Sequence, residues 1–330
     1  MSTGSVTGRV IVVTPNPAVD VTYEVATPRM GTVNRVARVA RRPGGKGINV
    51  ASVLHQLRGI GADAPELRLG GFLGGSQGQE LQEALEDWGL EQRWVDPGGA
   101  YRTRSTVVVR DADGGATGFY EPGSPVTAHD WQALASTVLD GAGPGDVLVV
   151  AGSCPPGTRA EELAGLLQAA RALGVRTVLD TSGPLLLACA GGADLLKPNL
   201  EELTEATGEH DPRAGAEILL RAGARGVVVS DGPRGMHLLS RVGATVRSWH
   251  AAPPPVEVVN PTGAGDAAVA ALAAHLAARP GTEPVGGRAL EVAVALSAAA
   301  VRTPVAGLVD PDTYTTLLHQ VKAEDTDAAD

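Results

Sequence analysis

The feature that most constrains the fold is a regular alternation of short apolar strands and amphipathic helices after Asp146. Val147 to Val150, Thr177 to Asp180 and Val227 to Ser230 are apolar runs of strand length that are rich in β-branched residues. This alternation predicts a doubly wound α/β fold, with a mostly parallel sheet and helices on both faces. The segments between these runs predict helices at 159–173, 183–190, 199–207 and 213–222 and a further strand at 194–197.

The composition fits a core of this kind. Aromatic residues make up only 3% of the chain, so the core must be built from Val, Leu, Ile and Ala, as in parallel sheets covered by helices. Ligands of doubly wound sheets bind beyond the C-terminal ends of the strands. The polar residues that the sequence places there are Asp180, Lys197, Asn199, Ser230 and Asp231.

The N-terminal half indicates a second, smaller sheet. Arg9 to Thr14 has the pattern of a buried strand of the main sheet. Val19 to Val25, Thr103 to Arg110 and Thr117 to Glu121 instead alternate polar and apolar residues. Together with Thr32 to Arg38, these segments predict a small β-sheet lid beside the main core.

The expected domain organisation is a single α/β domain over residues 8–320. Its lid is formed by about residues 19–42 and 100–124. The Ser/Thr/Gly-rich residues 1–7 and the acidic residues 322–330 are expected to be disordered tails.

The charge balance argues against nucleic acid as a partner. The chain has 27 basic and 37 acidic residues, a net charge of −10, whereas nucleic-acid binders usually carry a basic face. Any phosphate must therefore be captured by local Lys, Arg and backbone amides. The two cysteines cannot form a metal site, and no apolar run approaches membrane-spanning length. We expect a cytoplasmic protein.

The segment from Asn260 to Asp266 (NPTGAGD) has the properties of a phosphoryl-transfer site. Gly263, Ala264 and Gly265 let backbone N–H groups approach an anion closely. The Ala-rich helix that follows directs its positive end at the same anion. Asp266 can accept the proton of an attacking hydroxyl. Such turns are common, so this segment alone leaves an ordinary glycine-rich helix start as the alternative.

Together with four further segments, this motif resembles the ribokinase-like (PfkB) family of sugar kinases. The resemblance extends from about Val10 to Leu318 and is closest to the phosphosugar branch, which includes 1-phosphofructokinase and tagatose-6-phosphate kinase. Ala267 and the Ala151-Gly152-Ser153 segment depart from the family pattern, which puts the fine placement of the substrate in doubt. The four further segments are TPNPAVD at 14–20, PGGKGINVA at 43–51, TRSTV at 103–107 with EPG at 121–123, and KPNLEEL at 197–203.

The resemblance implies that residues of the N-terminal half bind the phosphosugar. Asp20 and Asn49 would orient the sugar hydroxyls, and Lys46 and Arg104 would hold the phosphate, for which the planar fork of arginine is well suited. Arg35 is a candidate for a second positive group. The substrate-binding residues implied in this way are Asp20, Gly44, Gly45, Lys46, Asn49, Arg104 and Arg35.

The C-terminal half would bind the nucleotide and carry out the reaction. Asp266 would be the catalytic base, and the amides of Gly263, Ala264 and Gly265 would stabilise the transferring phosphoryl group. Asn199 and Glu202, an N-x-x-E motif, would organise Mg²⁺ mainly through water. The ATP-binding residues implied are Lys197, Asn199, Ser230, Gly232, Gly235, Gly263 and Gly265.

The resemblance therefore implies ATP- and Mg²⁺-dependent phosphorylation of a hexose phosphate at a primary hydroxyl. Fructose 1-phosphate is favoured, with fructose 1,6-bisphosphate as the product. Tagatose 6-phosphate, fructose 6-phosphate and an unphosphorylated sugar are the alternative acceptors. A non-catalytic sensor of sugar phosphate or nucleotide is the alternative outside enzymes. No nucleic-acid or membrane partner is expected, and the lid could pair two chains in a homodimer.

Overall fold

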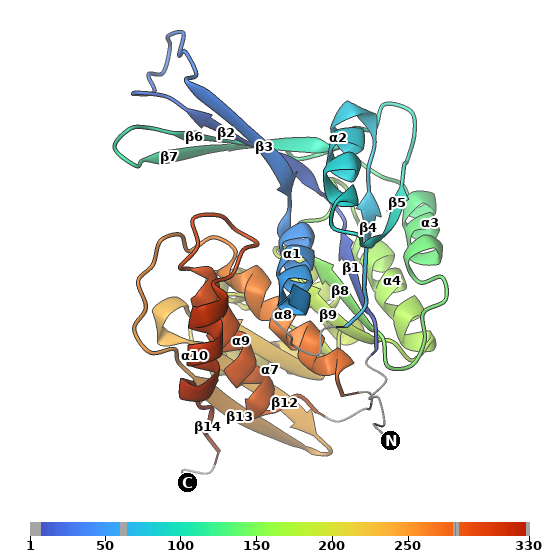
Figure 1. The fold of residues 1–330 in the computed structure, drawn as a ribbon. Coiled ribbons are helices and arrows are strands. Elements are labelled where there is room, and N and C mark those ends of the chain that lie inside the picture. The colour runs from blue at the N-terminus through green and yellow to red at the C-terminus, as the bar shows by residue number, and fades with distance from the viewer. Residues whose placement is uncertain (1–7, 60–64, 280, 282–283, 328–330) are drawn as a thin grey trace, which may run out of the picture.

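The computed structural model describes residues 8–59, 65–279, 281 and 284–327. Its main sheet has the strand order β14-β13-β12-β11-β10-β9-β8-β1-β4-β5 and is parallel from β5 to β11 (Figure 1). The remaining three strands extend it as an antiparallel edge. The predicted parallel sheet is confirmed. Its strands are β1 (Val10–Thr14), β4 (Leu67–Phe72), β5 (Glu91–Val95), β8 (Val147–Ala151), β9 (Arg176–Asp180), β10 (Leu195–Leu196), β11 (Gly226–Ser230), β12 (Met236–Val242), β13 (Thr245–Ala251) and β14 (Glu324–Asp325).

Helices cover both faces of this sheet, and the alternation of side chains along β1 shows how. Val10 and Val12 pack into the core under the first group of helices, whereas Ile11 and Val13 pack into the core under the second group. The first group contains α1 (Lys46–Gly59), α2 (Gly75–Glu86), α8 (Ala264–Ala277), α9 (Gly287–Ala300) and α10 (Pro311–Gln320). The second group contains α3 (Ala128–Val138), α4 (Ala160–Ala172), α5 (Pro184–Ala188), α6 (Leu200–Thr207) and α7 (Pro212–Arg221).

The small second sheet has the order β3-β2-β6-β7 and projects away from the main sheet near the start of α1 (Figure 1). The expected strand at 32–38 is wrong, because β3 begins only at Arg38 and pairs back along β2 as far as Gly44. Val33 and Val36, whose apolar character suggested a strand, are exposed in the loop beyond the hairpin, where they have no sheet to cover. Its strands are β2 (Ala18–Glu24), β3 (Arg38–Gly44), β6 (Arg104–Arg110) and β7 (Ala116–Tyr120).

The expected disorder of residues 322–330 is also wrong for the part that the structure describes, which ends at Asp327. β14 pairs with the outer strand β13, and the carboxylate of Asp327 accepts hydrogen bonds from the amide of Ser248 and from Arg213. The acidic composition suggested a solvated tail, but these partners from distant parts of the chain hold it in place. Residues 1–7 and 328–330 lie outside the described residues. Among the residues described, no helix has the length and apolar character needed to cross a membrane.

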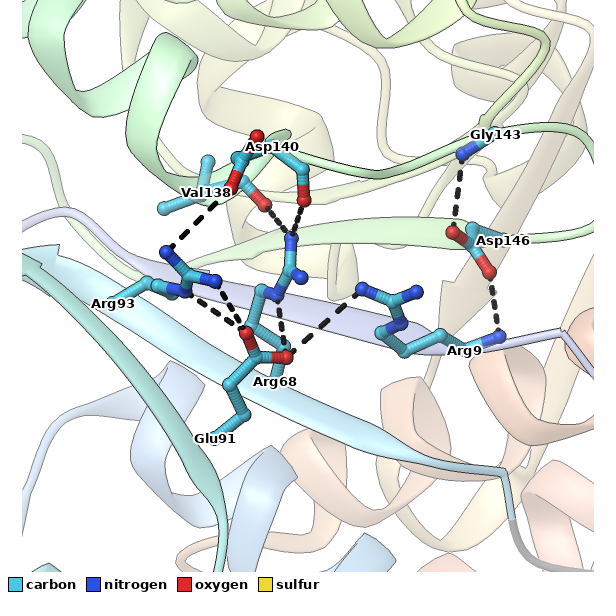
Figure 2. A network of polar contacts seen from close by, with 8 residues as sticks. All are labelled: Arg9, Arg68, Glu91, Arg93, Val138, Asp140, Gly143 and Asp146. Carbon is cyan, nitrogen blue, oxygen red and sulfur yellow. Dashed lines mark hydrogen bonds and ion pairs between the residues drawn. The ribbon is translucent and has the colours of Figure 1, made fainter.

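An ion network ties together the N-terminal ends of β1, β4 and β5 (Figure 2). The buried guanidinium of Arg68 donates from Nε to Glu91 at 2.9 Å and from Nη1 to the carbonyls of Val138 and Asp140, at the C-terminal end of α3. Arg93 donates to the other oxygen of Glu91 at 2.9 Å. The hydrogen bond from Arg68 is the main cause that lowers the pKa of Glu91. The polar groups at this end of the sheet thus bind one another, and the doubly wound topology places ligands at the other end.

Candidate active site

The candidate site lies where the parallel strands end and the small sheet begins. β9 ends at Asp180, β10 leads directly into Lys197, and β11 ends at Ser230. β1 ends at Thr14 and runs on through a short turn into β2 of the small sheet. The polar residues that the sequence placed beyond the strand ends are thus gathered at one edge, as the doubly wound topology requires.

Asp266 is buried in the first turn of α8 and accepts a hydrogen bond from Asn49 Nδ2 at 2.8 Å. Burial is the main cause that raises its pKa to about 6. The nearby Asp180 raises it further, while Asn49, Lys46 and Lys197 act in the opposite direction. A carboxylate with this pKa is ionised at neutral pH and still basic enough to take a proton from an alcohol in a transition state.

The turn before α8 can be built only with glycine. Gly263, the N-cap of α8, has φ 92° and ψ −6°, in the left-handed region that other residues rarely adopt. A Cβ atom at this position would also lie 2.9 Å from Ala306. The turn places Ala264 and Gly265, the first two residues of α8, in the wall of a pocket, where a helix N-terminus favours an anion.

Lys46, the first residue of α1, contacts two carboxylates. Its Nζ lies 3.2 Å from Asp180 Oδ1 and 3.0 Å from Glu202 Oε1. Burial lowers the pKa of Lys46, but the two carboxylates outweigh burial and hold the pKa above its ordinary value. The sequence predicted this lysine to hold the substrate phosphate, whereas in the structure its ammonium pairs with Asp180 and Glu202.

Asp180 is a site residue to which the sequence assigned no role. It is almost fully buried at the end of β9, and its Oδ2 has no hydrogen-bond partner among the described residues. The one sequence signal was its position as the last residue of an apolar strand in a doubly wound sheet. A buried carboxylate oxygen without a partner is costly unless a ligand or water satisfies it.

Asn199 and Glu202 form a reciprocal capping box at the start of α6. Asn199 Oδ1 accepts from the amide of Glu202 at 2.7 Å, and Glu202 Oε2 accepts from the amide of Asn199 at 3.0 Å. Only Oε1 of Glu202 is turned to Lys46 and the centre of the site. Asp180 Oδ2 and Glu202 Oε1 are thus the carboxylate oxygens available beside Lys46, and the Mg²⁺ roles of Asn199 and Glu202, mainly through water, stay predictions.

Asp20 lies at the base of the β2–β3 hairpin. Its carboxylate accepts a hydrogen bond from Thr106 Oγ1 and lies 3.9 Å from the guanidinium of Arg42. A Cβ atom on Gly44 would fall 2.1 Å from this carboxylate, so only glycine leaves room for it. Burial is the main cause that raises the pKa of Asp20.

Two arginines of the small sheet lie near the site, Arg104 and Arg42, whereas Arg35 does not. Arg104 donates to the carbonyls of Asn16 and Glu121, which fixes its guanidinium at the foot of the small sheet. Arg42 faces Asp20 and was missed, although its place two residues before the glycine pair was a usable signal. Arg35 lies in the exposed loop that connects β2 and β3, at the opposite end of these strands from Asp20. Within a single chain, Arg35 and Asp20 are therefore not brought together.

A cavity of about 720 Å³, a size suited to a small-molecule cofactor, opens beside the N-terminus of α8. Five of the predicted ATP-binding residues line it, namely Asn199, Ser230, Gly232, Gly235 and Gly265. Lys197 lies next to it, because a Cβ atom on Gly265 would be 3.2 Å from the lysine Nζ. The sequence missed the wall formed by α9, where no motif marks the contacts of Val294, Ser297, Ala298 and Val301.

Comparisons with known proteins agree with this geometry. The family model described as pfkB family carbohydrate kinase matches residues 11–313. The chain is 32% identical over 326 residues to 1-phosphofructokinase of Vibrio cholerae, covering 96% of both chains. It is 28% identical to tagatose-6-phosphate kinase of Staphylococcus epidermidis, covering 81% of this chain and 85% of the relative. Phosphofructokinase-2 of Escherichia coli in complex with fructose-6-phosphate has a TM-score of 0.80 at 27% identity, covering 95% of this chain and 99% of that structure.

Proposed function

The chain belongs to the pfkB family of carbohydrate kinases, and on that premise we propose that it phosphorylates fructose 1-phosphate to fructose 1,6-bisphosphate with ATP. The observation that carries the proposal is the buried Asp266, which faces Asn49 on the sugar side and adjoins the nucleotide pocket through Gly265. The choice of sugar is supported by the relative named 1-phosphofructokinase, which matches almost the whole chain. Tagatose 6-phosphate and fructose 6-phosphate are the other acceptors, because relatives or solved neighbours carry those names.

The phosphosugar would bind at the base of the small sheet. Asp20 and Asn49 would accept and donate hydrogen bonds to ring hydroxyls, which fixes the orientation of the sugar. Two backbone carbonyls already hold the guanidinium of Arg104 in place. Its remaining N–H groups would therefore bind the phosphate with little further loss of side-chain entropy. Arg42 adds positive charge beside Asp20.

The primary hydroxyl of the sugar would lie between Asp266 and the phosphate end of the nucleotide. Asp266 would accept the hydroxyl proton as the oxygen attacks the terminal phosphorus of ATP. The amides at the start of α8 and the ammonium of Lys197 would stabilise the charge on the transferring group. Bound Mg²⁺, for which Asp180 and Glu202 offer oxygens, supplies further neutralisation of phosphate charge.

Three wider features belong to the same proposal. The small sheet would close over the sugar as a lid and exclude water, which limits hydrolysis of ATP. Its exposed apolar side chains, such as Val39 and Phe119, would pair with a second chain in a homodimer. A cytoplasmic location is expected, since ATP and hexose phosphates are available there.

A coupled assay of ADP production tests the proposal. The enzyme is given ATP, Mg²⁺ and one acceptor at a time: fructose 1-phosphate, tagatose 6-phosphate, fructose 6-phosphate or fructose. The expected result is the highest kcat/KM with fructose 1-phosphate and none above background with fructose. Faster turnover of free fructose would show a kinase of unphosphorylated sugars. Phosphosugar binding by calorimetry without ADP release would show a sensor.

A further inference from the structure

Lys46 joins the two halves of the site. Its backbone follows Gly44, which packs against Asp20, and Gly45, which packs against Thr14 and Pro17. Its ammonium instead reaches Asp180 and Glu202 on the nucleotide side. The lysine side chain is 38% exposed, whereas Asp180 is 1% exposed and Glu202 14%. The lysine is therefore the most exposed member of the cluster, and the two carboxylates are held by the end of β9 and by the capping box of α6.

The ammonium and a divalent cation compete for the same oxygens. Mg²⁺ needs oxygen ligands at about 2.0–2.1 Å in near-octahedral order. An ammonium already 3.2 Å from Asp180 and 3.0 Å from Glu202 leaves no room for such an ion between these two carboxylates. Oδ2 of Asp180 has no hydrogen-bond partner among the described residues, so Lys46 does not satisfy all the carboxylate oxygens of the cluster.

We propose that Lys46 blocks Asp180 and Glu202, the carboxylates that would bind a divalent cation, until its ammonium moves to the phosphate of the bound sugar. We call this arrangement the Lys46 latch. This inference rests on the proposed function, because it requires a phosphorylated sugar. When Lys46 turns to that phosphate, Asp180 and Glu202 lose their counter-ion beside the ionised Asp266. The uncompensated charge of Asp180 and Glu202 then favours entry of a divalent cation that keeps most of its water ligands.

The coupling must be reciprocal. A phosphosugar that displaces Lys46 raises the affinity for the cation, and the cation raises the affinity for the phosphosugar by the same factor. A coupling of this kind typically amounts to about 5–150-fold. Its consequence is that the enzyme binds the metal tightly only when an acceptor is present, which restrains ATP hydrolysis without sugar.

The test measures Mn²⁺ binding to the full chain without nucleotide, by electron paramagnetic resonance of the free ion. For the wild type, fructose 1-phosphate is expected to tighten Mn²⁺ binding by about tenfold, and fructose is expected to leave it unchanged. Lys46→Met is expected to bind Mn²⁺ tightly without sugar and to show no further effect of the phosphosugar. Lys322→Met, which removes an exposed lysine outside the site, is the matched control and should behave like the wild type.

The outcomes separate the latch from the kinase proposal. If Lys46→Met and Lys46→Gln, both folded by circular dichroism, bind Mn²⁺ no more tightly than the wild type, the latch is wrong even when the enzyme turns over fructose 1-phosphate. An unchanged wild-type affinity with bound phosphosugar would overturn it equally. If calorimetry shows that no hexose phosphate binds, the proposed substrate class fails, while the comparison of the variants still decides whether Lys46 blocks the carboxylates.

Discussion

The two ends of the parallel sheet carry polar clusters of opposite character. At the N-terminal end, Arg68 uses its buried guanidinium on Glu91 and on two carbonyls, and Arg93 occupies the remaining carboxylate oxygen (Figure 2). At the C-terminal end, Lys46 is shared between Asp180 and Glu202, and one buried oxygen of Asp180 has no partner among the described residues.

The pKa values follow the same division. Arginine hydrogen bonds lower the pKa of Glu91, so that carboxylate is held in its charged form. Burial and a neighbouring carboxylate raise the pKa of Asp266 to about 6, so its charge is only partly compensated. The Arg68–Glu91 cluster, whose charges are matched, can do little beyond holding strands together, and we call it the saturated cluster. The cluster of Lys46, Asp180, Glu202 and Asp266 has unmatched acceptors that can take a cation or a proton.

The largest effect is expected from removing the charge of Asp266. Asp266→Asn keeps the shape of the side chain but cannot accept the hydroxyl proton, so turnover should fall by roughly 10²–10⁴-fold. Steady-state kinetics measures this, and calorimetry should show that ATP still binds. Asp312→Asn, in the first turn of α10, is the matched control and should be silent. Near-normal turnover of Asp266→Asn would remove Asp266 from the role of base.

The saturated cluster should show the reverse profile, with lost stability and retained activity. Arg68→Met removes the donor of two carbonyls and one of the donors to Glu91, so the free energy of unfolding should fall by about 2–4 kcal/mol. Urea denaturation measures this change. Arg93→Met, at a more exposed position, should cost less than about 1 kcal/mol. A specific loss of kcat in folded Arg68→Met would contradict the division between the two ends.

A smaller effect is expected for the arginine at the foot of the small sheet. Arg104→Ala should raise KM for the phosphosugar by about 10–100-fold, the equivalent of roughly 1.5–3 kcal/mol for a charged hydrogen bond, with little change in KM for ATP. Arg102→Ala is the control, because Arg102 is more exposed and pairs with Glu121. Equal effects on both substrates would show that Arg104 has a structural role only.

The smallest expected effect is the dependence of kcat/KM on pH. Because Asp266 must be ionised to act as a base, kcat/KM should rise with pH and level off above its pKa of about 6. The stability contribution of the same group has the opposite sign. Its folded pKa lies above the ordinary value of 3.8, so the contribution is present below 3.8 and is lost as pH rises through about 6. Rates measured from about pH 5 to 8 that stay flat would contradict the assignment.

Much of this arrangement could be predicted from the sequence because it depends on local patterns. The apolar strands after Asp146 predicted the parallel sheet, and the motif around Asp266 predicted a helix that starts directly after the glycine-rich turn. Contacts between distant segments could not be predicted in this way. The pairing of Lys46 with Asp180 and Glu202 joins residues of α1, β9 and α6. No single motif predicts these distances or the raised pKa of Lys46.

The position of the third strand of the small sheet, β3, was also not predictable from the sequence. The strand at Arg38–Gly44 contains three arginines among its seven residues and ends in a Pro-Gly pair, a composition that local propensity favours for a loop. Only its pairing with β2 makes it a strand. The same error placed Arg35 in a strand and left Arg42 without a role, whereas the structure places Arg35 in the exposed loop and Arg42 opposite Asp20.

The most direct test of the central claim is the distance from the Asp266 carboxylate to the acceptor hydroxyl. It can be measured in a crystal structure with fructose 1-phosphate and a non-hydrolysable ATP analogue. The account predicts a primary hydroxyl oxygen within about 2.6–3.2 Å of Asp266, with the terminal phosphate against the start of α8. A sugar bound with all its hydroxyls turned away from Asp266 would contradict it.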